Sequence, residues 1–215
     1  MSVPPRPQGP VIRPYRAEDR DAVAEICVRT AAGGGDARGI YSDDLLMPDV
    51  YCLPYVTYAP DLAWVVDDDD TVIGYVVAVA DTRAFVEWYA RDWAPGFRTR
   101  HPEPGAMGRD FHYGEDQLVR DGADPQRMLR GITPDELAAY PAHLHIDLLP
   151  RGQRRGLGRR LLDTLRAELS SRGVPGVHLG MDPGNTNARA FYDAYGFQEL
   201  PSHRPDVPLL GIPTR

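Results

Sequence analysis

The chain has 215 residues, and its 24 basic against 31 acidic residues give a formal net charge of −7. All 24 basic residues are arginines, which excludes chemistry that needs a lysine ammonium, such as a Schiff base or a Walker-type phosphate loop. The acidic balance argues against a nucleic-acid partner, and the longest apolar run, 71–80, is about half of what a membrane span requires.

The first third of the chain begins with a proline-rich leader, 1–10, which we expect to be disordered and which lacks the apolar block of a signal peptide. Hydrophobic periodicity and turn residues then predict a strand at 11–13, a helix at 17–31, an irregular segment at 36–60, and a hairpin of strands at 62–66 and 72–80. Cys27 and Cys52 make no disulfide framework, so we expect reduced thiols in a cytoplasmic protein.

The middle of the chain shows weaker helical patterns. These patterns predict helices at 83–92, 115–120 and 134–140. The last has a capping-box start, because Thr133 is followed by Pro134 and then by Glu136. Residues 95–114 are rich in Gly, Pro, Arg and His, and an irregular segment of this length is typical of a binding loop or a lid.

The last third alternates strands and helices, which indicates an α/β core. A strand at 143–149 places His143, His145 and Asp147 on one face. After it we expect a leucine-rich helix from 157 to about 173, a strand at 177–181, a helix at 187–194, and strands at 197–200 and 207–212.

The turn between that first strand and the leucine-rich helix has the features of a phosphate site. Its sequence is Gln153-Arg154-Arg155-Gly156-Leu157-Gly158. The N–H groups of a helix's first turn lack intrahelical partners and carry a partial positive charge, and glycines allow a diphosphate to approach the backbone. Five arginines crowd this region: Arg151, Arg154, Arg155, Arg159 and Arg160. The sequence therefore predicts an anion site here.

The same turn resembles the acyl-CoA-binding motif of the Gcn5-related N-acetyltransferases (GNAT), with Gln153, Gly156 and Gly158 at the matching spacing. A second motif of that family is similar to Asn185, Ala188, Tyr192 and Gly196-Phe197. Segments 53–57, 73–76 and 84–86 look like the acetyltransferase-like C-terminal domain of eukaryotic O-GlcNAcases, which lacks the intact turn. The resemblance therefore implies a stand-alone, cofactor-competent bacterial relative.

The resemblance also implies an architecture and an activity. The expected fold is α/β (α+β), with a mixed, mostly antiparallel sheet splayed at the coenzyme site and helices on both faces. Residues 11–215 would form a single domain with insertions at about 33–60 and 82–141. The implied reaction is direct transfer of an acetyl group from acetyl-CoA to an unidentified amine, a small molecule or a protein, without a metal. Acids in the first insertion and just after it (Asp43, Asp44, Asp49 and Asp61) would tolerate a cationic acceptor.

Site residues follow from the resemblance, position by position. The diphosphate would meet the turn and the start of the helix at Gln153, Arg154, Arg155, Gly156, Leu157, Gly158 and Arg159. Pantetheine and the acyl carbonyl would meet Leu148, Leu149 and Pro150, and Asn185 and Ala188 would line the pantetheine arm. Tyr192 would stand near the thioester sulfur and protonate the leaving thiolate. His145 and Asp147 are the candidates for the general base, and the choice depends on whether burial raises the pKa of the aspartate.

Two other functions remain open at this stage. The domain could bind acetyl-CoA, or a protein, without catalysis, as a pseudo-acetyltransferase. Alternatively, His143, His145 and Asp147 alternate along one strand face as ligands of zinc or iron do, which would suit a metal-dependent hydrolase.

Overall fold

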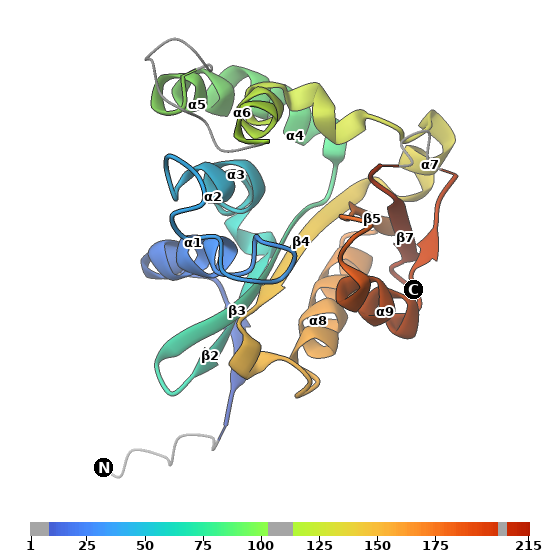
Figure 1. The fold of residues 1–215 in the computed structure, drawn as a ribbon. Coiled ribbons are helices and arrows are strands. Elements are labelled where there is room, and N and C mark those ends of the chain that lie inside the picture. Colours follow the sequence, from blue (N-terminus) through green and yellow to red (C-terminus); the bar gives the residue numbers. More distant parts are fainter. Residues whose placement is uncertain (1–8, 103–113, 202–205) are drawn as a thin grey trace.

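The computed structural model describes residues 9–102, 114–201 and 206–215, so most of the expected leader and of segment 95–114 lies outside the described residues. The described strands form one seven-stranded sheet in the order β1-β2-β3-β4-β5-β7-β6 (Figure 1). Their bounds are β1 Val11–Pro14, β2 Ala63–Asp68, β3 Thr71–Val79, β4 Ala142–Leu148, β5 Gly176–Gly180, β6 Gln198–Glu199 and β7 Leu209–Pro213. Neighbouring strands are antiparallel except β4 and β5, which confirms the mixed, mostly antiparallel sheet.

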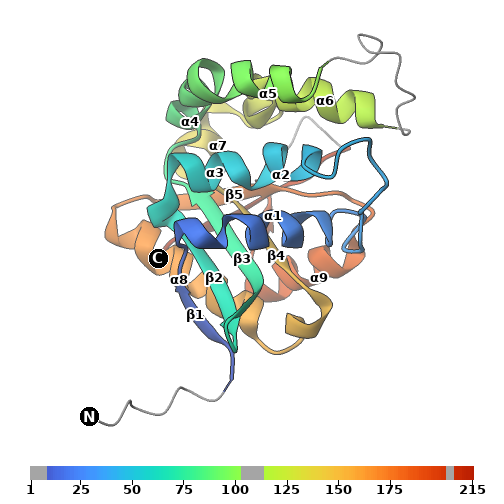
Figure 2. The same cartoon turned by 90° about the vertical axis from the view of Figure 1, so that its left-hand side faces the viewer.

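Helices cover both faces of this sheet (Figures 1 and 2). They are α1 Arg20–Val28, α2 Leu46–Tyr51, α3 Leu53–Tyr58, α4 Thr82–Trp88, α5 Ala94–Arg100, α6 Glu115–Ala123, α7 Pro134–Ala139, α8 Leu157–Ser171 and α9 Thr186–Tyr195. A π-helical turn, Tyr89–Trp93, joins α4 to α5, and short 3₁₀ segments lie at Ala17–Asp19, Pro60–Leu62, Pro125–Leu129 (η4) and Pro150–Gly152. None of the described helices is long and apolar enough to cross a membrane.

Alternation along β3 divides the core into two parts. Tyr75, Val77 and Val79 face α1, α2 and α3, while Val76 and Ala78 face α8 on the opposite side. The α8 side is completed by five buried leucines at the predicted helical spacing: Leu157, Leu161, Leu162, Leu165 and Leu169. Each buried leucine contributes roughly 1.5–3 kcal/mol to stability, so this helix is firmly held against the sheet.

The expectation of an irregular segment at 36–60 is wrong in its second half, where α2 and α3 form. Pro48 and Pro54 do not break these helices, because both occupy the first turn, where a backbone N–H has no intrahelical partner. Segment 95–114 is likewise helical as far as Arg100, and its remainder, 103–113, lies outside the described residues. The capping box at Thr133 is confirmed.

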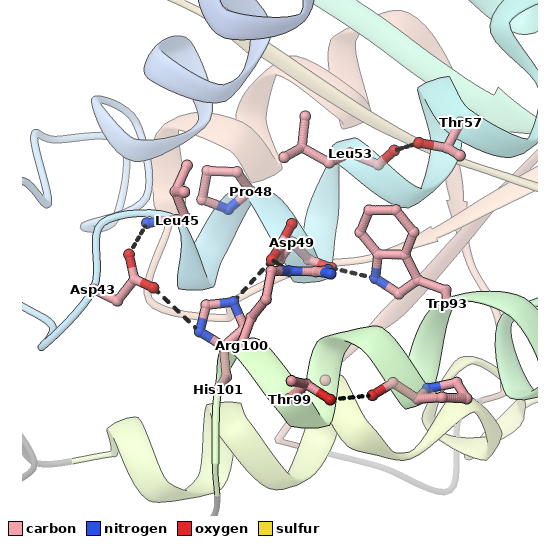
Figure 3. A network of polar contacts seen from close by, with 12 residues as sticks. Asp43, Leu45, Pro48, Asp49, Leu53, Thr57, Trp93, Thr99, Arg100 and His101 are labelled. Carbon is pink, nitrogen blue, oxygen red and sulfur yellow. Dashed lines mark hydrogen bonds and ion pairs between the residues drawn. The ribbon is translucent and has the colours of Figure 1, made fainter.

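A buried polar network joins α2 to α5 (Figure 3). Asp49 in α2 is 4% exposed, and its Oδ2 accepts hydrogen bonds from Arg100 Nε at 2.7 Å and from His101 Nε2 at 2.8 Å. His101 Nδ1 lies 3.4 Å from Asp43, and Trp93 Nε1 donates to the Asp49 carbonyl. This network fixes the stack of α4, α5 and α6 above α2 and α3 that both views show (Figures 1 and 2).

Candidate active site

The sheet opens between β4 and β5. These parallel strands pair only at Ala142–Val177 and His143–His178, so the rest of β4, from Leu144 to Leu148, has no partner on that side. Beyond the opening, β5 pairs with β7 instead. Parallel strands with one backbone edge unpaired leave N–H and C=O groups available to an extended ligand. This splay was expected from the resemblance.

The turn after β4 presents free backbone donors. Within the described ranges, the N–H groups from Arg154 to Gly158 donate to no protein acceptor, and α8 starts at Gly156 without a side-chain cap. Arg154 and Gly156 both have positive φ angles, 58° and 75°, which point successive N–H groups to one side. Gly156 has open space where a Cβ would stand. This is the geometry of an anion cradle at a helix N-terminus.

Close packing around Leu148 holds the turn against the end of β4. A Cβ added to Gly74 would lie 2.5 Å from Leu148, and one added to Gly158 would lie 3.3 Å from it. The Gln153 side chain donates to the Leu148 carbonyl at 2.9 Å. Gly158 also lies against Phe191 of α9, where a Cβ would be 3.1 Å from the ring. Glycine at 74 and 158 is therefore what lets strand, turn and helix meet this closely.

The arginines around the turn do not all face it. Arg155 lies 3.7 Å from Asp68 of β2, and Arg159 stacks over the Tyr195 ring at 5.0 Å. Arg160 reaches the Pro10 carbonyl. Part of the positive charge that the sequence assigns to the turn thus has partners elsewhere. The main evidence for an anion site is therefore the set of backbone N–H groups.

The second motif places three residues near the opening. Asn185 caps α9, its Oδ1 accepting from the Ala188 N–H at 3.0 Å. Tyr192 is 9% exposed, and its hydroxyl has no hydrogen-bond partner among the residues that the structure describes. Burial, together with the neighbouring Asp147 charge, raises the pKa of Tyr192, so the phenol stays protonated at neutral pH. The Tyr192 phenol is therefore an available proton donor.

A cavity of about 570 Å³ lies beside β4, where β4 and β5 separate. Its walls come from helices α1–α3, the segment 121–130, and strands β4 and β5. The lining includes Cys27, Met47, Tyr51, Tyr55, Arg127, His143, Leu144, His145, Asp147, His178, Met181 and Val207. Two of the three predicted catalytic residues, His145 and Asp147, therefore share one cavity. None of the insertion acids Asp43, Asp44, Asp49 and Asp61 lines it.

Asp147 occupies an unusual environment for a carboxylate. Its Oδ2 accepts a hydrogen bond from the Tyr75 hydroxyl of β3. Burial raises the pKa of the Asp147 carboxyl, and the hydrogen bond from Tyr75 offsets only part of that rise. A carboxylate with a raised pKa accepts a proton more readily than an ordinary aspartate.

The two histidines belong to one directional hydrogen-bond chain. Thr82 donates its hydroxyl proton to the Pro141 carbonyl at 2.7 Å, so its oxygen accepts from His143 Nδ1 at 2.9 Å. His143 Nε2 must then accept from the Tyr55 hydroxyl at 2.7 Å. Tyr55 in turn accepts from His145 Nε2 at 3.1 Å. Because each hydroxyl has one proton, the chain assigns N–H to His145 Nε2 and leaves its Nδ1 as an acceptor.

The surroundings of His145 and Asp147, the two candidate bases, reverse the ordinary order of their pKa values. Burial, with a smaller contribution from the Arg127 charge, lowers the pKa of His145 to about 3. Burial raises the pKa of Asp147 instead. His145 is therefore neutral at physiological pH, with Nδ1 as its hydrogen-bond acceptor, whereas Asp147 is the better proton acceptor of the two.

The metal-ligand pattern on β4 does not come together as a site. His143 uses both ring nitrogens in hydrogen bonds, to Thr82 and to Tyr55. In the part of the chain that the structure describes, no group of three or more His, Cys, Asp or Glu side chains is placed to hold a metal ion. His203 lies outside the described residues.

Four residues of this site escaped the sequence interpretation: Tyr55, Tyr75, Thr82 and Arg127. Tyr55 and Tyr75 lie in the segments that resemble the O-GlcNAcase domain, so a signal existed for them, although not for their roles. Thr82 reads in the sequence as an ordinary helix start. Nothing in the sequence around Arg127 distinguishes it from the other arginines.

Comparison with known proteins agrees with this geometry. Residues 38–197 match the acetyltransferase (GNAT) family. The chain belongs to this family. It is 46% identical to the solved structure of SsHAT, with a TM-score of 0.86 over 96% of this chain and 99% of that one. The GNAT fold is thereby confirmed, and family members transfer acetyl groups from acetyl-CoA.

Two more distant relatives show what else shares the fold. The Rattus norvegicus protein O-GlcNAcase is 22% identical over 93% of this GNAT chain, which spans about a fifth of that relative's length (22%). The PaiA N-acetyltransferase of Thermoplasma acidophilum, solved in complex with coenzyme A, is 14% identical with a TM-score of 0.57, covering 96% of this chain and 99% of that one. At these identities the likeness is one of fold.

Proposed function

We propose that this protein is an N-acetyltransferase that moves the acetyl group of acetyl-CoA to a primary amine held in the cavity beside β4. The observation that carries the proposal is the meeting of two half-sites at one strand end. The N–H cradle of Arg154–Gly158 follows β4 directly, and the cavity with Asp147 and His145 lies on β4 itself.

The residues at the cradle fit a coenzyme A diphosphate. N–H groups without acceptors, and a helix N-terminus with no side-chain cap, supply the donors that a diphosphate needs. The unpaired edge of β4 at Leu148, followed by Leu149 and Pro150, would take the pantetheine arm, with Asn185 and Ala188 on the α9 side. Acetyl-CoA supplies an acyl group activated as a thioester.

The chemistry divides among three side chains. Asp147 takes a proton from the acceptor ammonium, whose nitrogen then attacks the thioester carbonyl carbon as the C–S bond breaks. Tyr192 gives its hydroxyl proton to the departing thiolate sulfur. The attacking nitrogen loses a further proton as the amide forms, and this proton restores Tyr192 through water. Asp147 releases its proton to solvent, so one proton is produced per acetyl group transferred. His145 Nδ1 orients the attacking amine.

The test is an acetyl-CoA-dependent thiol-release screen over a panel of amines and peptides, run with wild type and with Tyr192→Phe. We expect release with at least one acceptor and a fall in kcat of about a hundredfold in the variant, with the KM for acetyl-CoA unchanged. Binding of acetyl-CoA by calorimetry without release for any acceptor would favour a non-catalytic binding domain. An unchanged kcat in Tyr192→Phe would remove the phenol from the mechanism.

A further inference from the structure

Arg127 is the one cavity-lining cation of the described chain that no carboxylate neutralises. It belongs to η4, and no acidic oxygen of the described residues lies within ion-pair distance of its guanidinium. The other arginine in the lining, Arg130, is paired with Asp121 at 2.9 Å and with Asp124. The two arginines are three residues apart, so the difference arises from their surroundings and not from their position along the chain.

The contacts of Arg127 leave hydrogen-bonding capacity unused. One terminal nitrogen donates to the Val50 carbonyl at 2.9 Å, and Nε is buried without any partner. The guanidinium stacks over the rings of Tyr51 at 5.5 Å and Tyr89 at 5.9 Å. Aromatic rings stabilise a cation without neutralising it. Since arginine cannot lose its proton in a protein, the positive charge persists in a half-buried place.

The Arg127 charge acts on β4, the strand that contains His145 and Asp147. Arg127 and His145 line the same cavity, and the Arg127 charge contributes to the lowered pKa of His145. Asp147 lies two residues further along the same face of β4 and lines the same cavity. The cavity thus contains one cation, Arg127, that has no carboxylate partner among the described residues, and the proton-accepting carboxylate of Asp147. Three further carboxylates line it: Asp121, which pairs with Arg130, and Asp182 and Asp206.

From this arrangement we infer that the acceptor is a small molecule with both a primary amine and an anionic group, the amine toward Asp147 and the anion paired with Arg127. The inference rests on the proposed function for the role of the amine, but the binding of the anion is independent of turnover. A planar guanidinium recognises carboxylate and phosphate oxygens through paired hydrogen bonds. Met47, Met128 and Met181 also line the cavity and offer flexible apolar walls to the body of the acceptor. An acceptor without an anionic group would leave the Arg127 guanidinium without an ionic partner.

Matched acceptor pairs test the inference. We would compare L-phenylalanine with L-phenylalaninamide, L-methionine with L-methioninamide, and O-phosphoethanolamine with ethanolamine in the thiol-release assay. An α-amino group beside an amide has a pKa of about 8, so intrinsic reactivity at neutral pH favours the amides. We expect wild type to favour the anionic member by at least tenfold in kcat/KM, as a charge-assisted hydrogen bond permits. The two amino-acid pairs test for recognition of a carboxylate, and the phosphoethanolamine pair tests for recognition of a phosphate.

The variants are Arg127→Met, with Arg130→Met as the matched control. We expect Arg127→Met to bring the ratio of kcat/KM for the acid to kcat/KM for the amide close to one, because the KM for the acid rises. Arg130→Met should keep the wild-type ratio. Arg127→Lys should give an intermediate ratio, because lysine keeps the positive charge but cannot make the paired hydrogen bonds of a planar guanidinium. An equal fall for acids and amides in Arg127→Met would show that Arg127 only supports the fold through Val50. An altered KM for acetyl-CoA alone would assign Arg127 to the coenzyme.

Binding without turnover separates failure of this inference from failure of the proposed function. In the presence of coenzyme A, we would measure the melting temperature with L-phenylalanine, L-methionine, O-phosphoethanolamine and their counterparts that lack the anionic group. A rise with an anionic member in wild type that is absent in Arg127→Met supports the inference even where no acetyl transfer is detected. Acetyl transfer to amines with no preference for the anionic members, and no such rise, would overturn the inference while leaving the proposed function intact.

Discussion

The coenzyme turn and the acceptor cavity share β4 but are built in opposite ways. The turn is one continuous segment, Gln153–Gly158, whose donors are backbone N–H groups. The cavity draws its side chains from α1, α2, α3, η4, β4 and β5, and its polar groups act through partners distant in sequence. Tyr55 and His145, for example, are 90 residues apart. The comparison suggests that the turn is tolerant of side-chain changes that respect its backbone, whereas the cavity depends on individual side chains.

The largest effect is expected at Asp147. Asp147→Asn should lower kcat by about a thousandfold, since an amide accepts no proton. Because the folded protein raises the pKa of this carboxyl, its charge opposes folding at neutral pH, and the variant should melt no lower than wild type. In wild type the rate should fall with acid at a pH above 3.8, the ordinary value for aspartate. Rate profiles and melting curves check both effects, and a fully active Asp147→Asn enzyme would refute the assignment.

A single negative charge placed in the turn should prevent it from binding the coenzyme. Gly156→Glu places a carboxylate where a phosphate is expected, and we predict at least a hundredfold weaker binding of acetyl-CoA by calorimetry. Gly156→Ala is the control, because it shares the cost of a positive φ, about 1 kcal/mol, without the charge. Equal losses in the two variants would mean that backbone strain, and not an anion, explains the effect.

The hydrogen-bond chain of the cavity gives a smaller effect. Tyr55→Phe removes the hydroxyl between His143 and His145 and leaves Nε2 of each imidazole without its partner. It should cost about 1–3 kcal/mol of stability and lower kcat by less than about tenfold. Tyr58→Phe in the same helix is the control, since no hydrogen bond of its hydroxyl is found within the described ranges. Denaturant titration and steady-state rates separate the two variants.

The network between α2 and α5 should affect stability and leave the chemistry unchanged. Hydrogen bonds with His101 and Arg100 lower the pKa of Asp49 despite its burial, which acts in the opposite direction. A lowered folded-state pKa means that the stabilisation is complete above the unfolded value of 3.8 and is lost as the pH falls toward the folded value. Asp49→Asn should therefore lower the free energy of unfolding by about 1–3 kcal/mol at neutral pH. In urea titrations at several pH values, this free energy should fall less steeply with acid than it does in wild type. A change in kcat would contradict this separation.

The same contrast explains what could be predicted from the sequence. The turn, the α8 leucines and the alternation of His143, His145 and Asp147 are local patterns, and the structure shows each of them. The assignment of α2 and α3 failed because proline is compatible with a first helical turn. Arg127 could not be found, because its significance lies in having no ion-pair partner among the described residues, which depends on how η4 packs against α2. The order of the two bases likewise depends on burial.

The most direct test of the account is a crystal structure of the protein with acetyl-CoA. We predict that the diphosphate oxygens accept hydrogen bonds from the N–H groups of Arg154–Gly158, and that the thioester lies at the β4–β5 opening between Tyr192 and Asp147. A diphosphate bound away from this turn, or a thioester that does not reach the cavity, would contradict the claim that the two half-sites meet at the end of β4.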